Sequence, residues 1–518
     1  MTMTSPSLPF AVAIVVTVTA ATAEGATCES LLAFTRANTT ITSARLAAAG
    51  SFTLPSGQVN VPNPASLSNL PAFCRVTALL TPTSDSDIKI EVWLPAPRAE
   101  GAPGTAWNGK LQSVGNGAWA GVIPYPALGD AIRAGYASAG TDTGHVGNTA
   151  RFVPGHPEKM IDYGYRAVHE MTVAAKAITA AFYGTAPARS YWNGCSTGGR
   201  QGLMEAWRYP ADYDGIIAGA PVNHRTRQLT AELWVARAVH ASEASYIPPA
   251  KYPAIHRAAV EACDGNDGLK DGLIDDPRQC RFDPQALQCA AADGDSCLTA
   301  PQVAAARQIY SPAMAPASKK EIFPGLQRGG ELGWDALAGP RPIAEAVEFF
   351  QYVVVNDPAW DFKTLSFDTA AELADKAAGD VLNVVDPNLK PFFDRGGKLL
   401  LYHGWNDQFV SPINSINYYT SVLDAPATKG KLEDSIRLFM APGMNHCRGG
   451  EGPNAFDAIG TLDRWVEKGQ TPGRIDASHA TAGKIDRTRP LCAYPQVARY
   501  NGSGSIDEAA NFTCRATQ

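Results

Sequence analysis

Two polar residues that lie far apart in the chain each stand next to a cysteine. Ser196 follows Cys195 in a Gly-Cys-Ser-Thr-Gly run, and His446 directly precedes Cys447. A disulfide between these two cysteines would bring their Cα atoms to roughly 5.5 to 6 Å from each other. Such a bond would hold a serine hydroxyl near an imidazole, which is the arrangement of a nucleophile and its base.

A serine hydroxyl is a weak nucleophile at neutral pH, so it needs a base and a third group that orients the base. Asp407 and His446 each follow an apolar, strand-like run, 398–402 and 436–440. The chain order Ser196, Asp407, His446 is that of an α/β-hydrolase triad. The alternatives are a turn serine, a loop acid or helix cap, and a structural histidine. His403 stands on the wrong side of the acid, so we expect it to line the pocket.

The segment around Ser196 has the pattern of a nucleophile elbow. A short strand ends at Trp192, and a helix-compatible run covers 199–207, so the serine falls on the sharp turn between them. The oxyanion would rest on the backbone N–H of Thr197 and on an amide of the glycine-rich loop 114–119, for which we choose Gly117. A plain strand-to-loop turn is the alternative for that loop.

An acidic stretch between Cys263 and Cys280 resembles a calcium loop. Asp264, Asp267 and Asp271 are separated by glycines, which combines hard carboxylates with main-chain carbonyls at close spacing. No Glu closes the loop at its twelfth position, so it is not a full EF-hand. A solvated acidic turn is the alternative, but the bracketing cysteines favour a compact structural site.

The elements that must position these residues alternate between strand and helix. Apolar runs at 89–94, 110–114, 136–140, 190–192 and 215–218 are interspersed with helix-length stretches such as 162–183, and the strands resume at 398. This pattern predicts an open α/β sheet, with ligands bound where its strands end. The alternation fades over 223–387, where four cysteines crowd together. We therefore predict an inserted lid held by disulfides rather than by a deep core.

The predicted organisation is an α/β-hydrolase fold with a large inserted lid domain. Residues 24–222 form the first part of the hydrolase domain, 223–387 the lid with the calcium loop, and 388–518 the second part. Residues 1–23 combine an apolar run with a small-residue cleavage site, which predicts a signal peptide and a secreted or periplasmic protein. The net charge of -6 and the lack of a Lys/Arg block make nucleic acid and membrane poor partner candidates.

The ten cysteines are an even number, which in an exported chain indicates disulfides. None of them shows the paired spacing of a zinc site. Local spacing favours three pairs and leaves four cysteines, although spacing alone does not prove the pairing. The favoured pairs are Cys263–Cys280, Cys289–Cys297 and Cys492–Cys514, and the remainder would be Cys28 with Cys74 and Cys195 with Cys447.

Together these residues resemble the tannase and feruloyl esterase family, which also includes bacterial hydrolases of terephthalate mono-esters. The resemblance spans nearly the whole mature chain. It implies a Cys195–Cys447 disulfide that bridges the catalytic serine and histidine, with Ser196 as nucleophile, His446 as general base and Asp407 as the orienting acid. It also supports the other four disulfides.

The resemblance further implies a structural Ca²⁺ in the lid. Its ligands would be the side chains of Asp264, Asp267 and Asp271 and the main-chain carbonyls of Leu269 and Leu273. The metal would have no catalytic role.

The resulting expectation is an exported serine esterase that cleaves esters of small aromatic acids through an acyl-enzyme. Feruloyl esterase is the first choice, tannase the second and terephthalate mono-ester hydrolase the third. Lid aromatics such as Phe349, Phe350, Tyr352 and Trp360 could line a flat slot, although most of them are expected in the core. A non-catalytic, calcium-stabilised binding protein and a serine peptidase remain alternatives.

Overall fold

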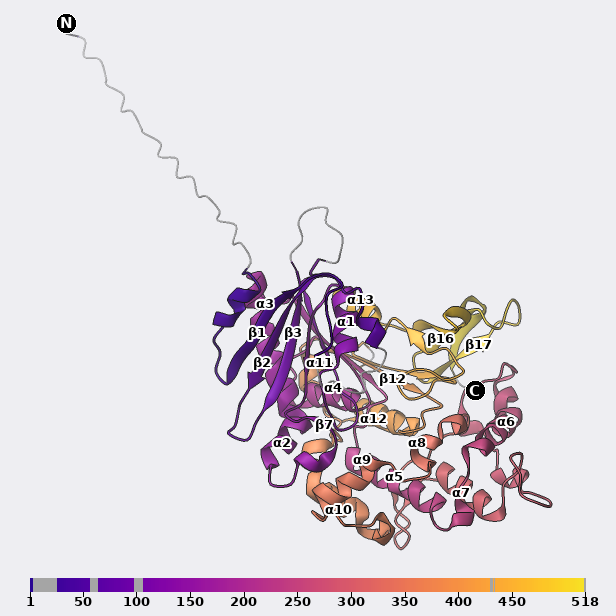
Figure 1. Cartoon of the computed structure of the whole chain (residues 1–518). Coiled ribbons are helices and arrows are strands. Elements are labelled where there is room, and N and C mark those ends of the chain that lie inside the picture. Colours follow the sequence, from indigo (N-terminus) through magenta and orange to yellow (C-terminus); the bar gives the residue numbers. More distant parts are fainter. Residues whose placement is uncertain (3–25, 56–63, 97–105, 429–431, 433, 517–518) are drawn as a thin grey trace.

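The computed structural model describes residues 1–2, 26–55, 64–96, 106–428, 432 and 434–516. Nearly all of the predicted signal peptide, 1–23, therefore lies outside the described residues. The rest of the chain is built around one large sheet, with an insertion on one side and a group of small sheets at the C-terminal end (Figure 1).

The central sheet has nine strands. From β6 to β13 the neighbouring strands are parallel, whereas β1, β2 and β3 pair antiparallel at one edge. The predicted strands are confirmed as parts of β3, β4, β6, β8, β9, β12 and β13, while the edge strands β1 and β2 were not predicted. The strands, in order across the sheet, are β1 (Thr39–Ala47), β2 (Phe73–Leu80), β3 (Ile88–Pro95), β6 (Ala137–Thr141), β4 (Lys110–Val114), β8 (Arg189–Cys195), β9 (Gly215–Gly219), β12 (Lys398–Gly404) and β13 (Ile436–Ala441).

Helices cover both faces of the parallel part, which explains why β6 and β9 are buried along their whole length. On one face α3 (Ala167–Tyr183), α4 (Thr197–Arg208) and α12 (Pro412–Asp424) pack on the largest apolar cluster. On the other face lie α1 (Tyr125–Arg133) and α13 (Ala458–Lys468). The predicted helix 162–183 begins with a π-helical turn, 162–166, and continues as α3. The architecture is that of an α/β hydrolase.

Between β9 and β12 the chain leaves the sheet and forms a mostly helical insertion, drawn in magenta to orange below the sheet in Figure 1. The prediction that disulfides rather than a core hold this region is wrong, because a cluster of buried apolar side chains such as Ile255, Ile309 and Trp334 lies wholly within it. Its α-helices and strands are α5 (Arg225–Val239), α6 (Tyr252–Cys263), α7 (Ala300–Tyr310), β10 (Ala313–Met314), β11 (Glu321–Phe323), α8 (Asp335–Ala338), α9 (Ala344–Glu348) and α10 (Phe367–Leu382), after which α11 (Lys390–Asp394) leads back to β12.

On either side of α13 the chain contributes strands to small antiparallel sheets that the sequence did not predict. One of them joins β14 (Ala455–Phe456), β15 (Arg474–Thr481) and β16 (Lys484–Cys492), and another joins β17 (Gln496–Tyr500) and β18 (Phe512–Ala516). Arg489 of β16 and Arg499 of β17 bind the acidic loop of the insertion, through the side chain of Asp271 and the carbonyl of Asp267. The C-terminal strands therefore brace the predicted calcium loop.

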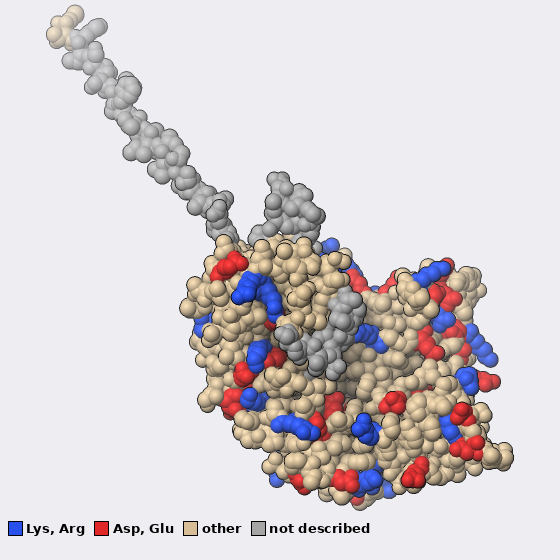
Figure 2. All heavy atoms as spheres, in the orientation of Figure 1, with Lys and Arg blue, Asp and Glu red and all other residues tan. Residues whose placement is uncertain are grey.

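Basic and acidic side chains are interspersed on the visible face of the molecule, and no continuous basic patch is seen there (Figure 2). Among the described residues, no helix is both long and apolar enough to cross a membrane.

Candidate active site

Ser196 lies at the turn between β8, which ends at Cys195, and α4, which begins at Thr197. Its backbone has φ 63° and ψ −123°, a strained conformation for a residue with a side chain. The turn is tight because glycines flank it: a Cβ on Gly194 would lie 2.5 Å from the carbonyl oxygen of Gly198. The predicted nucleophile elbow is present in the backbone.

Asp407 and His446 are in direct contact. Nδ1 of His446 lies 2.6 Å from Oδ2 of Asp407, and the carboxylate is buried whereas the imidazole keeps 14% of its side-chain surface exposed. Oδ1 of Asp407 accepts the backbone N–H groups of Phe409 and Val410, both at 2.8 Å. Burial alone would raise the pKa of Asp407, but the charge and hydrogen bond of His446 and the hydrogen bond of His403 bring it well below its usual range. The carboxylate is thus ionised and fixed in position.

His403 differs from its prediction. It is fully buried rather than exposed in a pocket, and its Nε2 lies 2.9 Å from the same Oδ2 of Asp407. Its Nδ1 lies 2.7 Å from the hydroxyl of Ser415. The Asp407 carboxylate accepts from Nε2, and the Ser415 hydroxyl holds the ring at its other nitrogen. The sequence order alone excluded His403 as a base but could not reveal this supporting contact.

The disulfide between Cys195 and Cys447 joins the two halves of the site, with a Cα–Cα distance of 5.9 Å. Because adjacent Cα atoms are about 3.8 Å apart, the Cα atoms of Ser196 and His446 are separated by at most about 13.5 Å. Cys447 itself has φ 64°. Non-glycine residues with strained backbones are concentrated at functional sites. Here one of them, Ser196, follows Cys195, and the other, Cys447, is the disulfide partner of Cys195.

The loop after β4 packs on the N-terminus of α4. Thr197 Oγ1 donates to the carbonyl of Ala118 at 3.0 Å, and the N–H of Asn116 donates to the side chain of Gln201 at 3.0 Å. As the first residue of α4, Thr197 has a backbone N–H without a partner inside its own helix. Gly117 is exposed between these two anchored residues. Thr197 and Gly117, the predicted oxyanion pair, thus come from two backbone segments that touch.

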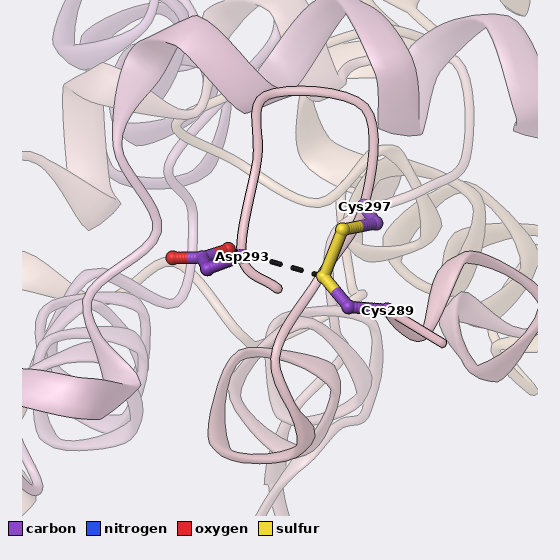
Figure 3. Close-up of side chains that lie close together, drawn as sticks. All are labelled: Cys289, Asp293 and Cys297. Carbon is purple, nitrogen blue, oxygen red and sulfur yellow. Dashed lines mark hydrogen bonds between the residues drawn. A yellow bond between two sulfur atoms is a disulfide. The ribbon is translucent and has the colours of Figure 1, made fainter. Parts of the chain in front are cut away.

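The structure contains all five predicted disulfides: Cys28–Cys74, Cys195–Cys447, Cys263–Cys280, Cys289–Cys297 and Cys492–Cys514. Figure 3 shows one of them, in which Asp293 faces the sulfur of Cys289 across a small loop of the insertion. Since the sulfurs of Cys289 and Cys297 are bonded to each other, they are not thiolate ligands for a metal.

The predicted calcium ligands lie on one compact loop. The carboxylate of Asp264 accepts the N–H groups of Asp271 and Gly272, at 3.1 and 3.0 Å. The carboxylates of Asp267 and Asp271 likewise accept the N–H groups of Leu269 and Leu273, at 2.9 and 3.1 Å. This curls the segment so that acidic side chains and backbone carbonyls are close in sequence and space. The donor set is all oxygen, which suits Ca²⁺.

Asp275, which is not among the predicted ligands, belongs to the same cluster. It lines a small cavity together with Asp267 and Arg499, and only 8% of its surface is exposed. Burial, followed by the charge of Asp267, raises the pKa of Asp275 to about 7. This excess of buried negative charge fits a bound cation. The signal was present in the sequence, because Asp275 occupies the twelfth position of the loop.

A second group of metal-binding residue types, His169, Glu205 and Asp212, lies away from both sites. Nδ1 of His169 is 2.7 Å from Asp212. Burial, followed by the charge of Asp212, raises the pKa of Glu205 well above its usual value.

The aromatic residues considered for a substrate slot are mostly in the core. Phe349 and Phe350 are completely buried, and Tyr352 and Trp360 pack against the same cluster. The ring beside the site is instead Phe409, whose centroid lies 5.2 Å from that of His446 with an edge-on geometry.

The family model described as tannase and feruloyl esterase matches residues 74–515. The chain belongs to this family. It is 38% identical to an uncharacterized esterase of Xanthomonas campestris pv. campestris over 94% of this chain and 91% of that protein. It is 33% identical to feruloyl esterase B of Aspergillus niger, over 92% and 93% of the two chains.

Among solved structures, feruloyl esterase B from Aspergillus oryzae superposes with a TM-score of 0.86 at 30% identity, covering 94% of this chain and 99% of that one. The family, the relatives and the fold agree. The protein is a carboxylic-ester hydrolase of the feruloyl esterase and tannase type, which acts on small ester substrates.

Proposed function

We propose that this esterase hydrolyses esters of hydroxycinnamic acids, with Ser196 as nucleophile, His446 as general base and Asp407 as the acid that orients the base. The observation that carries the proposal is the 2.6 Å contact between Asp407 and His446 on a loop that a disulfide ties to the elbow of Ser196. An imidazole that donates from Nδ1 to a carboxylate has Nε2 free to accept the serine proton.

The reaction proceeds in two stages. Ser196 attacks the ester carbonyl while His446 takes its proton, and the negative charge that develops on the carbonyl oxygen is stabilised by the backbone N–H groups of Thr197 and Gly117. His446 then protonates the departing alcohol, which leaves an acyl-enzyme. In the second stage His446 activates water, which releases the acid and restores Ser196.

The hydroxycinnamoyl group is favoured over the galloyl and terephthaloyl groups because the relatives described above include feruloyl esterase B from two Aspergillus species. Tannase and terephthalate mono-ester hydrolase activities are the competing candidates, and a non-catalytic binding protein is the candidate from another class.

Kinetics with methyl ferulate, methyl gallate, a terephthalate mono-ester and a peptide substrate test the proposal, with Ser196→Ala as the control. We expect the highest kcat/KM for methyl ferulate and a loss of turnover in the variant. A higher kcat/KM for methyl gallate or for the terephthalate mono-ester would show that the preferred acyl group is galloyl or terephthaloyl instead of hydroxycinnamoyl. Undiminished turnover by Ser196→Ala would remove Ser196 from the mechanism.

The proposal includes a structural Ca²⁺ in the insertion. Its ligands would be the carboxylates of Asp264, Asp267 and Asp271 and the carbonyls of Leu269 and Leu273, with Asp275 beside them. The ion would offset the buried negative charge and hold the loop against the C-terminal strands. It takes no part in the chemistry.

The proposal also includes export to the periplasm or the medium. Five disulfides fit an oxidising compartment. A small uncharged ester does not need a positively charged surface to attract it, which agrees with the net charge of -6. The proposal accordingly includes neither nucleic acid nor membrane as a partner.

A further inference from the structure

A small cavity lies where helix α5 of the insertion meets the loop that follows Asp407. Its walls include Gln228 and Glu232 of α5 and, across from them, Phe409 and Ser411. The volume is about 20 Å³, which is enough for one water molecule or one hydroxyl group but not for an aromatic ring. The cavity therefore suits the polar end of a larger ligand.

Glu232 has a carboxylate oxygen that lacks a partner. Only 2% of the residue is exposed, and Oε1 accepts a hydrogen bond from Nε2 of Gln228. Among the described residues, Oε2 has no hydrogen-bond partner although it is fully buried. Leaving a buried acceptor unpaired costs free energy, so a donor supplied by a ligand would be favourable.

Two other residues of α5 fix the orientation of Glu232. Nη1 of Arg225 donates to Oε1 of Gln228 at 2.6 Å, which leaves the amide nitrogen of Gln228 for Glu232. Arg225 in turn pairs with Glu345 of α9. These residues form one buried hydrogen-bonded row along α5. Because the charge of Arg225 is already met by Glu345, the row has no free cation to offer an anionic substrate.

The cavity is next to the catalytic machinery. Phe409, one of its walls, has its ring 5.2 Å from that of His446 and donates its backbone N–H to Asp407. Burial raises the pKa of Glu232 to about 7, and Arg225, Gln228 and His446 oppose that rise.

We infer that Glu232 accepts a hydrogen bond from a hydroxyl group of the ester substrate and thereby selects hydroxylated esters. The inference rests on the proposed function. A hydroxyl supplies the donor that Oε2 lacks. An ester without a hydroxyl group leaves this oxygen unpaired, so a hydroxylated ester is favoured over its analogue that lacks the hydroxyl.

The hydroxyl could belong to the acid or to the alcohol, and two pairs of probes separate these sources. Methyl p-hydroxycinnamate and methyl cinnamate differ only on the acid side, whereas 2-hydroxyethyl benzoate and ethyl benzoate differ only on the alcohol side. For one pair we expect wild type to favour the hydroxylated ester by roughly tenfold or more in kcat/KM, since a site built around a polar group discriminates against analogues that lack its partner.

Glu232→Met should bring that ratio close to one, while Glu232→Gln, whose carbonyl still accepts a hydrogen bond, should give an intermediate ratio. Glu372→Met, on the exposed side of α10, is the matched control and should keep the wild-type ratio. Thermal melts establish that each variant is folded. If Glu232→Met does not fold, the test rests on Glu232→Gln, whose side chain has nearly the same shape as that of Glu232.

Equal ratios in wild type and in the folded Glu232 variants, for both pairs, would overturn the inference. Failure of the proposed function looks different, because wild type would then turn over no hydroxycinnamate ester at all.

Discussion

Asp407 binds His446 through a hydrogen bond of 2.6 Å between Oδ2 and Nδ1. The same oxygen lies 2.9 Å from Nε2 of His403, a buried residue on the preceding strand β12. One carboxylate oxygen therefore accepts hydrogen bonds from two imidazoles. Only His446 is partly exposed, which makes it the one that can reach a substrate, while His403 supports the acid from the inside.

Asp407→Asn should lower kcat by roughly 10³- to 10⁴-fold, because an amide stabilises the wrong tautomer of His446 and cannot balance the imidazolium. KM should change little, since Asp407 is buried away from the substrate. Steady-state kinetics with methyl ferulate at neutral pH measure both constants. A decrease of less than about tenfold would show that Asp407 does not orient the base.

His403→Leu should lower kcat by roughly tenfold with little change in KM, because Asp407 loses one hydrogen-bond donor and part of its fixed orientation. His403→Gln, which can still donate to Asp407, should recover most of the rate. A merely structural role predicts a lower Tm in both variants with the same kcat. The kcat values of the two folded variants, measured well below their Tm, decide between these outcomes.

Removing the active-site disulfide should impair chemistry more than binding. With Cys195→Ala and Cys447→Ala together, we expect kcat to fall by roughly 100-fold while KM stays within a few-fold, because a shift of about 1 Å between nucleophile and base has an effect of this size. The kinetics are measured with methyl ferulate at a temperature where the variant is folded.

The matched control removes Cys492 and Cys514, which join β16 to β18 far from Ser196 along the chain. That variant should have a lower Tm and an unchanged kcat. If the Cys195 and Cys447 variant behaves in the same way, the active-site disulfide contributes stability alone.

Much of the site could be predicted because its signals are local. The elbow needs glycines at fixed distances from Ser196, and Asp407 and His446 directly follow apolar strands. The edge strands β1 and β2 and the C-terminal sheets were missed, since polar residues interrupt their apolar ones. β1 and β15 contain exposed residues, whereas β2 alternates between buried and half-buried residues. The role of His403 depends on its burial and on Ser415 of helix α12, and that of Glu232 depends on its burial and on the loop of Phe409 across the cavity, which no local spacing encodes.

Calcium should stabilise the folded protein. At a free concentration a hundredfold above its Kd, a ligand that binds only the folded state adds about 2.7 kcal/mol to the free energy of unfolding. We therefore expect a chelator to lower Tm and added Ca²⁺ to restore it. Differential scanning calorimetry of the chelated protein, with and without Ca²⁺, measures the shift.

Asp264→Asn and Asp275→Asn should each weaken Ca²⁺ binding by roughly tenfold or more, because each removes one carboxylate from the loop. Calorimetric titration of the chelated protein gives the Kd values. Asp295→Asn, an exposed change in the same insertion, should leave the Kd as in wild type. Wild-type affinity in Asp275→Asn would exclude this residue from the site, and no Ca²⁺ binding by wild type would refute the site itself.

His256 makes stability depend on pH where the insertion meets the loop of His446. Its ring contacts Glu331 at 3.1 Å and Glu451 at 2.8 Å. Burial alone would lower the pKa of His256, but its hydrogen bonds to these two carboxylates raise it from 6.5 to about 9. The folded state thus binds the proton more tightly than the unfolded state does. The stabilisation is complete below pH 6.5 and is lost as the pH rises through about 9.

His256→Gln should consequently lower Tm most at about pH 6, and the difference from wild type should shrink as the pH approaches the folded-state pKa of about 9. Thermal melts of both proteins across this range measure the difference. His156→Gln, at an exposed position, should have a small effect throughout. A penalty for His256→Gln that is the same at both ends of the range would mean that His256 contributes packing rather than charge to the contact between the insertion and the loop of His446.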